Sequence, residues 1–197
     1  MVKRARYVIG LGLAALICLF MLAGCVEQTQ DDQSAAQDNQ PIQIEDENFA
    51  ITPINLASEI NKNLPNSVQP IALVQGTTVI QGSEYPSEGG DYGFVQKGTF
   101  SIVMLATGQN FSSTGRINFV ATSFDVIADY YSATLKAIDP QMTDDLAKQM
   151  EDTMHVDGSG SSKPVTVHDI TYYCDFVQGG IRLSIFPQVV NGVSTLA

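Results

Sequence analysis

The 197-residue chain has two histidines, His155 and His168. The ordinary pKa of a histidine side chain suits acid–base chemistry near neutral pH. His168 is followed by Asp169, and together they could supply part of a Ser-His-Asp triad. Both residues fall in an alternating run that predicts a strand, where neighbouring side chains point to opposite faces. We therefore expect that His168 and Asp169 do not pair and that His168 is structural.

Cys174 is the only cysteine that follows residue 25. It lies between Tyr172 and Phe176 on the apolar side of the same run, which predicts a buried and unreactive thiol. His168 shares this side, but six residues of strand separate it from Cys174 by roughly 20 Å, too far for one metal. The chain also lacks the common nucleotide-binding, zinc-protease and serine-hydrolase motifs. We expect no catalytic residue, metal site or cofactor, although an enzyme is not excluded.

The first 25 residues have the composition of an export signal. Three basic residues and an uncharged apolar run, 8–22, precede the small pair Ala23-Gly24 and then Cys25. A positive head, a short apolar segment and small residues before the cut are typical of secretory signals. The apolar run is shorter than the roughly 20 residues that span a bilayer as a helix, so we expect cleavage rather than a membrane-spanning anchor.

The four residues 22–25, Leu-Ala-Gly-Cys, resemble the lipobox of bacterial lipoproteins, in which a leucine and two small residues precede an invariant cysteine. The resemblance covers residues 1–25. It implies cleavage between Gly24 and Cys25 and a diacylglyceryl group on Cys25. Two acyl chains are enough to hold a protein stably on a membrane. We therefore expect a lipid-anchored protein of the cell membrane or outer membrane, with its domain extracytoplasmic.

Charge and composition divide the rest of the chain. Removal of the signal, 1–24, leaves seven basic and 21 acidic side chains, and this net charge of −14 argues against a nucleic-acid partner. The segment 25–47 begins with the lipidated cysteine and continues as an acidic stretch without Lys, Arg or aromatic residues. Such a composition predicts a disordered tether. Residues 48–197 are expected to form a single α+β domain.

The domain is predicted to contain about three helices and about five strands. Helix-capping patterns favour helices that begin after Thr52, near Thr122 and after Thr143. Alternating β-branched and aromatic residues indicate strands in the runs 69–81, 92–107, 116–122, 168–176 and 181–185. The resulting order, α-β-β-β-α-α-β-β, predicts an antiparallel sheet with helices packed on it. The order also allows two related halves.

One predicted loop is a candidate for binding a partner. Residues 84–93, EYPSEGGDYG, hold Tyr85 and Tyr92 among three acidic residues at a strand connection. Exposed aromatic side chains on loops often anchor a binding partner. An ordinary hairpin connection is the alternative interpretation.

Because no catalytic constellation is visible, we expect a non-enzymatic module of the cell envelope. Its partner would be an envelope protein or a wall component, in addition to the membrane that it reaches through Cys25. Two alternatives remain open. One is an envelope hydrolase whose site is assembled from scattered residues, and the other is a purely structural spacer.

Overall fold

The computed structural model describes residues 41–80, 83–86, 90–96, 98–188 and 193–196. These residues belong to one unit of the chain, Asn39–Ala197. The export signal, Cys25 and the segment 26–40 lie outside the described residues, so the anchor and the lipid remain predictions. Among the described residues, no helix is long and apolar enough to cross a membrane.

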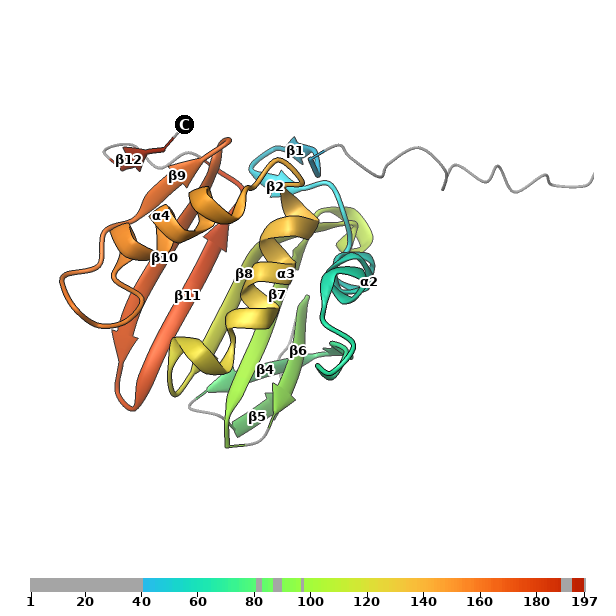
Figure 1. Cartoon of the computed structure of the whole chain (residues 1–197). Coiled ribbons are helices and arrows are strands. Elements are labelled where there is room, and N and C mark those ends of the chain that lie inside the picture. Colours follow the sequence, from blue (N-terminus) through green and yellow to red (C-terminus); the bar gives the residue numbers. More distant parts are fainter. Residues whose placement is uncertain (1–40, 81–82, 87–89, 97, 189–192, 197) are drawn as a thin grey trace, which may run out of the picture. The chain divides into compact units, whose positions relative to one another are not determined.

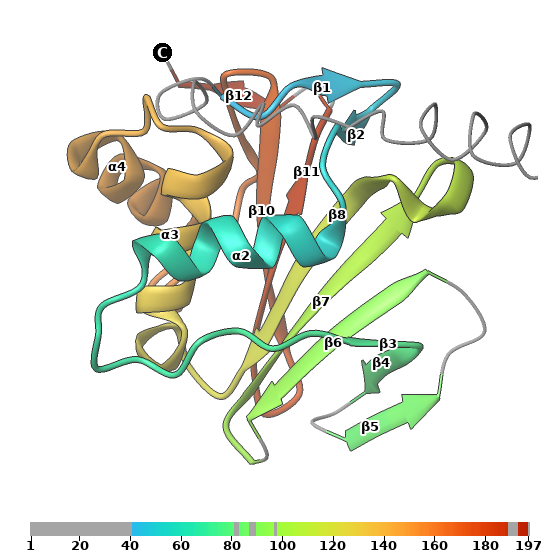
Figure 2. The ribbon, with the colours of Figure 1, turned by 90° about the vertical axis from the view of Figure 1, so that its right-hand side faces the viewer.

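A mainly antiparallel sheet of ten strands forms the centre of this unit (Figure 1). Eight strands follow the order β12-β9-β10-β11-β8-β7-β6-β3, while β2 pairs with β8 and β1 pairs with β2. The bounds are β1 Ile44–Glu45, β2 Asn48–Phe49, β3 Val74–Gln75, β6 Asp91–Gln96, β7 Phe100–Thr107, β8 Ser113–Ala121, β9 Val165–Val167, β10 Ile170–Val177, β11 Gly180–Phe186 and β12 Ser194–Thr195. A separate pair, β4 Thr77–Ile80 and β5 Ser83–Pro86, lies beside β6 (Figure 2).

In the described part of the chain, three α-helices cover one face of the sheet: α2 Pro53–Asn63, α3 Ala128–Ile138 and α4 Asp144–Met154 (Figures 1 and 2). The predicted starts of α2 and α4 are confirmed, because Thr52 Oγ1 accepts from Asn55 N at 3.2 Å and Thr143 Oγ1 accepts from Leu146 N at 3.1 Å. The predicted cap at Thr122 is wrong. A 3-10 turn precedes α3, which therefore starts later than the capping pattern indicates.

The core lies between the helices and the facing side of the sheet. The sheet contributes fully buried apolar side chains from its central strands, which include Ile102, Met104, Ile117, Phe119 and Leu183. The helices contribute Leu56, Ile60, Ile127, Leu135, Ile138, Met150 and Met154. This layering of helices on an antiparallel sheet confirms the predicted α+β class and the three helices.

The predicted number of about five strands and their order are wrong in detail. The runs 69–81 and 92–107 each divide into two strands, at Gly76 and Gly98, whose φ angles are 72° and 80°. Glycine adopts this left-handed conformation without steric cost, so the chain reverses although the alternation of side chains continues across it. The strands outside the predicted runs, which are β1, β2, β5, β9 and β12, have only two to four residues and are too short to show a period.

Ordered backbone begins before the predicted domain start at residue 48. Strand β1 lies within the segment assigned to the tether and pairs with β2. In addition, Ile42 N donates to Ile138 O at 3.1 Å. The acidic composition of residues 45–47 concealed this pairing, in which Glu45 ends β1 and Asp46 and Glu47 form the turn between the two short strands.

Candidate functional site

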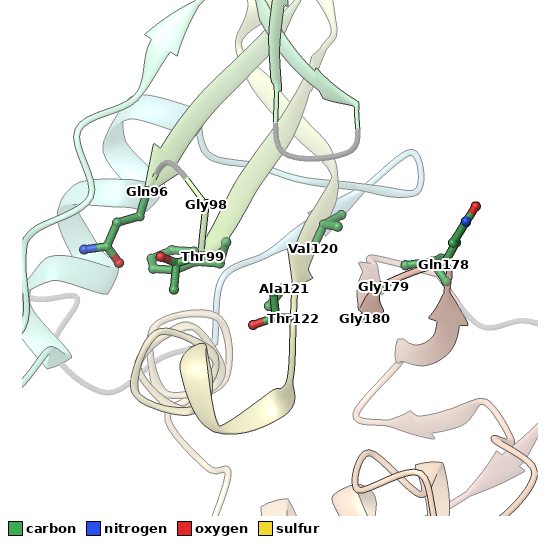
Figure 3. Close-up of a pocket in the computed structure, with 11 residues that line it drawn as sticks. Gln96, Gly98, Thr99, Val120, Ala121, Thr122, Gln178, Gly179 and Gly180 are labelled. Carbon is green, nitrogen blue, oxygen red and sulfur yellow. The ribbon is translucent and has the colours of Figure 1, made fainter.

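Strand β8 ends between two hairpin turns, and the three segments line a pocket (Figure 3). Residues 96 and 98–100 of the β6–β7 turn lie on one side, residues 177–180 of the β10–β11 turn lie on the other, and residues 120–122 lie between them. The pocket volume is about 440 Å³, within the range of small-molecule binding sites.

Glycines shape both walls of this pocket. Gly98 and Gly179 adopt positive φ angles of 80° and 86°, and a Cβ atom on either would meet no atom within 4 Å. Gly180 serves a different purpose, because a Cβ atom there would lie 1.9 Å from the carbonyl oxygen of Ala121. Only glycine at this position lets the start of β11 approach the end of β8 so closely, which fixes the distance between the pocket walls.

The lining is polar but uncharged in its described part. Exposed amide and hydroxyl side chains surround the opening, and these are Gln96, Thr99, Thr122 and Gln178. Apolar side chains form the remainder, and these are Phe100, Val120, Ala121 and Val177. Amides and hydroxyls both donate and accept hydrogen bonds, whereas an ionic ligand would need a charged partner. The described lining therefore suits an uncharged ligand group that is rich in hydroxyls or amides.

A histidine–carboxylate pair lies at the other end of β10. His168 and Asp169 form the turn between β9 and β10, with φ angles of 44° and 65°, so the predicted strand through both residues is wrong. The turn directs His168 toward the end of α3, where its Nδ1 lies 2.6 Å from Asp139 Oδ2. The sequence pointed only to Asp169 as a candidate partner of His168. In the structure the partner is Asp139.

Asp139 is fully buried at the C-terminal cap of α3, whereas the His168 side chain is 39 % exposed. The other oxygen of Asp139, Oδ1, accepts from Gln141 N at 3.0 Å. Burial, and next the negative charge of Asp139, raise the pKa of the nearby Tyr172 hydroxyl far above its usual range. This arrangement joins the end of α3, the α3–α4 connection and the β9–β10 turn, and it also orients the histidine ring as a carboxylate does in hydrolytic triads.

The pocket and the histidine–carboxylate pair are separate sites. Strand β10 runs from one to the other over eight residues, Ile170–Val177, which corresponds to about 27 Å. A single small substrate cannot contact both. Within the described ranges, no group of three or more His, Cys, Asp or Glu side chains could hold a metal ion.

The predicted binding loop has a different structure from the one expected. Tyr92 lies within β6, where it pairs with Met104 and packs half-buried against the core. Tyr85 lies in β5, but its side chain is outside the described part of the structure, as are residues 87–89. Tyr92 is thus part of the sheet rather than a free aromatic anchor.

Cys174 is fully buried, as the alternation of the strand predicts. Burial raises the pKa of its thiol from 9.0 to about 11, which leaves little thiolate at neutral pH. The thiol therefore belongs to the core and not to a reactive site.

Sequence reasoning missed both sites. The pocket joins three separate segments of the chain, and its only local signal is the pair Gly179-Gly180 in the predicted last hairpin. Asp139 precedes Pro140, a pattern that by itself indicates only the end of a helix. No protein-family model, curated protein or solved structure matches the chain, so the geometry alone guides the interpretation.

Proposed function

We propose that the protein is a lipid-anchored binding module of the bacterial cell envelope, which binds an envelope protein or a wall component at the pocket beside the end of β8. The lipobox-like residues 22–25 support the anchor. The pocket supports binding, because solvent-exposed polar side chains surround its opening and hydrogen-bonded turns form its walls.

The observation that carries this proposal is that the described residues which line the pocket are uncharged. General acid–base and nucleophilic catalysis need an ionisable or activated group within hydrogen-bond reach of the reacting atoms. The described lining instead offers the amides of Gln96 and Gln178 and the hydroxyls of Thr99 and Thr122. These groups recognise a ligand by hydrogen bonds without transforming it.

The test is site-specific crosslinking in intact cells. A photoreactive amino acid replaces Gln178 at the pocket or, as the matched control, Gln149 on the exposed side of α4. We expect a discrete adduct, identified by mass spectrometry, from position 178 and not from position 149. Adducts of equal yield from both positions, or from neither, would refute the proposed role of the pocket. Absence of any adduct would favour a structural spacer.

One observation favours a second candidate function, an envelope hydrolase. The hydrogen bond of 2.6 Å between His168 Nδ1 and Asp139 orients an exposed imidazole whose Nε2 is available as a base. Purified wild-type protein would be screened with model esters, peptides and glycans. Turnover that is lost in His168→Gln and Asp139→Asn but kept in the control His155→Gln would establish this function. No turnover by the wild type would exclude it for these substrate classes.

A further inference from the structure

The side of the sheet that faces away from the helices carries a polar strip next to the pocket. Cross-strand pairing places Ser184 beside both Asn118 and Tyr173, and it places Arg182 beside both Val120 and Asp175. With Arg116 and Phe186 at its far end, this set of eight side chains is called the outer strip. Side chains alternate along a strand, so these point away from the buried Ile117, Phe119 and Leu183. Figures 1 and 2 show all three helices on the opposite face.

Most polar groups of the outer strip pair with one another. Asp175 forms an ion pair with Arg182 and accepts a hydrogen bond from the Tyr173 hydroxyl. Although partial burial opposes them, these two contacts lower the pKa of Asp175. Ser184 Oγ lies 2.9 Å from Asn118 Oδ1. The charge of Arg182 is therefore balanced within the strip.

Arg116 differs from the other charged groups of the strip. It is exposed, and its guanidinium carbon lies 6.0 Å from the centre of the Phe186 ring. Among the described residues, no carboxylate lies within ion-pair distance of it. A guanidinium held against an aromatic ring presents a planar set of donors that matches a carboxylate. Arg116, which has no carboxylate partner among the described residues, thus offers a site for an external anion.

The negative charge of the domain lies mainly outside the outer strip. Helices α3 and α4 carry five acidic residues and two lysines on the other side of the sheet. The outer strip carries two arginines and one aspartate. At physiological ionic strength the screening length is about 8 Å, so the helical carboxylates act only weakly across the sheet. Of the two faces, the outer strip is the one that an anionic partner can approach.

The outer strip is continuous with the pocket. Val120 lines the pocket and also belongs to the strip, where it lies beside Arg182. Arg116 follows four residues away along β8, a distance of about 13 Å. A ligand held in the pocket would therefore have to be extended to reach Arg116.

We infer that the pocket and the outer strip together bind a linear glycan that carries carboxylates. The uncharged side chains described in the pocket would bind the hydroxyl or amide groups of one sugar, and Arg116 would bind a carboxylate farther along the glycan. This inference rests on the proposed binding function of the pocket.

The test compares two probes on the full-length lipidated protein in detergent micelles. Oligogalacturonate supplies a linear glycan with carboxylates, and a malto-oligosaccharide of equal length is the neutral probe. Titration calorimetry should show about tenfold tighter binding of the oligogalacturonate, and the preference should shrink as sodium chloride is raised. Arg116→Gln should remove the preference. Lys148→Gln on α4, which changes the net charge equally, should keep it.

Equal affinities for the two probes, or equal losses in Arg116→Gln and Lys148→Gln, would overturn the inference. If the neutral probe binds and Gln178→Ala weakens it, the pocket still serves binding and only the acidic-glycan inference fails. If crosslinking at position 178 captures a partner while neither glycan binds, the same conclusion holds. Failure of both the crosslinking and the titrations would overturn both proposals. Unchanged melting of Arg116→Gln excludes misfolding as the cause.

Discussion

Cys174 allows a quantitative test of how completely the β10–β11 hairpin is buried. Its thiol is fully buried, and burial raises its pKa from 9.0 to about 11. A group whose pKa is raised by folding contributes stability that is fully present below pH 9 and is lost as the pH rises through 11. The difference of two pKa units corresponds to about 2.7 kcal/mol, of which about 2 kcal/mol is lost by pH 10.5.

The perturbation is Cys174→Ala, studied at pH 8 and at pH 10.5. At pH 8 the variant should be less stable by about 1 kcal/mol, because it loses the packing of the sulfur in the core. At pH 10.5 the order should reverse, since only the wild type must hold a buried thiol against ionisation. Buried tyrosines such as Tyr131 also resist ionisation, but their effect is shared by both proteins and cancels in the difference.

The assay is urea unfolding at both pH values, with the free energy of unfolding taken from each curve. A second measurement follows alkylation of the peptide that contains Cys174 by mass spectrometry, so that other cysteines do not interfere. In the native protein at pH 8, about one thiol in a thousand is ionised, and labelling should require unfolding. Rapid native labelling, or a stability difference that does not change with pH, would refute the placement of Cys174 in the core.

Three further predictions concern the anchor, the histidine–carboxylate pair and the pocket wall. Cys25→Ser should abolish incorporation of labelled fatty acid and leave the precursor uncleaved on a gel; continued labelling would exclude the lipobox interpretation. His168→Gln should lower stability by about 1–3 kcal/mol in urea unfolding, because the buried Asp139 loses one of its hydrogen-bond donors, and an unchanged midpoint would mean that the pair does not join the elements. Gly180→Ala should lower the melting temperature more than Gly179→Ala, since only a Cβ atom at position 180 would collide with backbone atoms. The reverse order would contradict the close approach of β11 to β8.

Several features of the fold could be predicted because their causes are local. A threonine followed by a helical period identified the starts of α2 and α4, and the side chains of Thr52 and Thr143 accept the expected hydrogen bonds. The alternation around Cys174 correctly predicted its burial, because residues on one face of a strand share an environment. The predicted α+β class follows from the same two periods.

Predictions failed where glycine or a turn interrupted a pattern without changing its period. Gly76 and Gly98 divide runs that appear continuous in hydrophobicity, which explains why the number of strands was too low. His168 and Asp169 seemed to continue an alternating strand, but their positive φ angles form a hairpin turn. Non-glycine residues rarely adopt this conformation, and although His and Asp do so more often than most, this preference is weaker than the signal of the alternating pattern.

The sequence by itself predicted the export signal with its lipobox-like residues, and it determined the acidic character of the chain and the caps of α2 and α4, because each depends on residues that are close neighbours. Only the tertiary structure decided which distant residues meet. Asp139 and His168 lie 29 positions apart, and the pocket joins two hairpin turns and the end of β8. Strand order and register create these neighbours, and both are selected by packing of the buried face against the helices. That packing positions the polar side chains of the pocket and of the outer strip. Their positions therefore cannot be predicted from their own types and spacing.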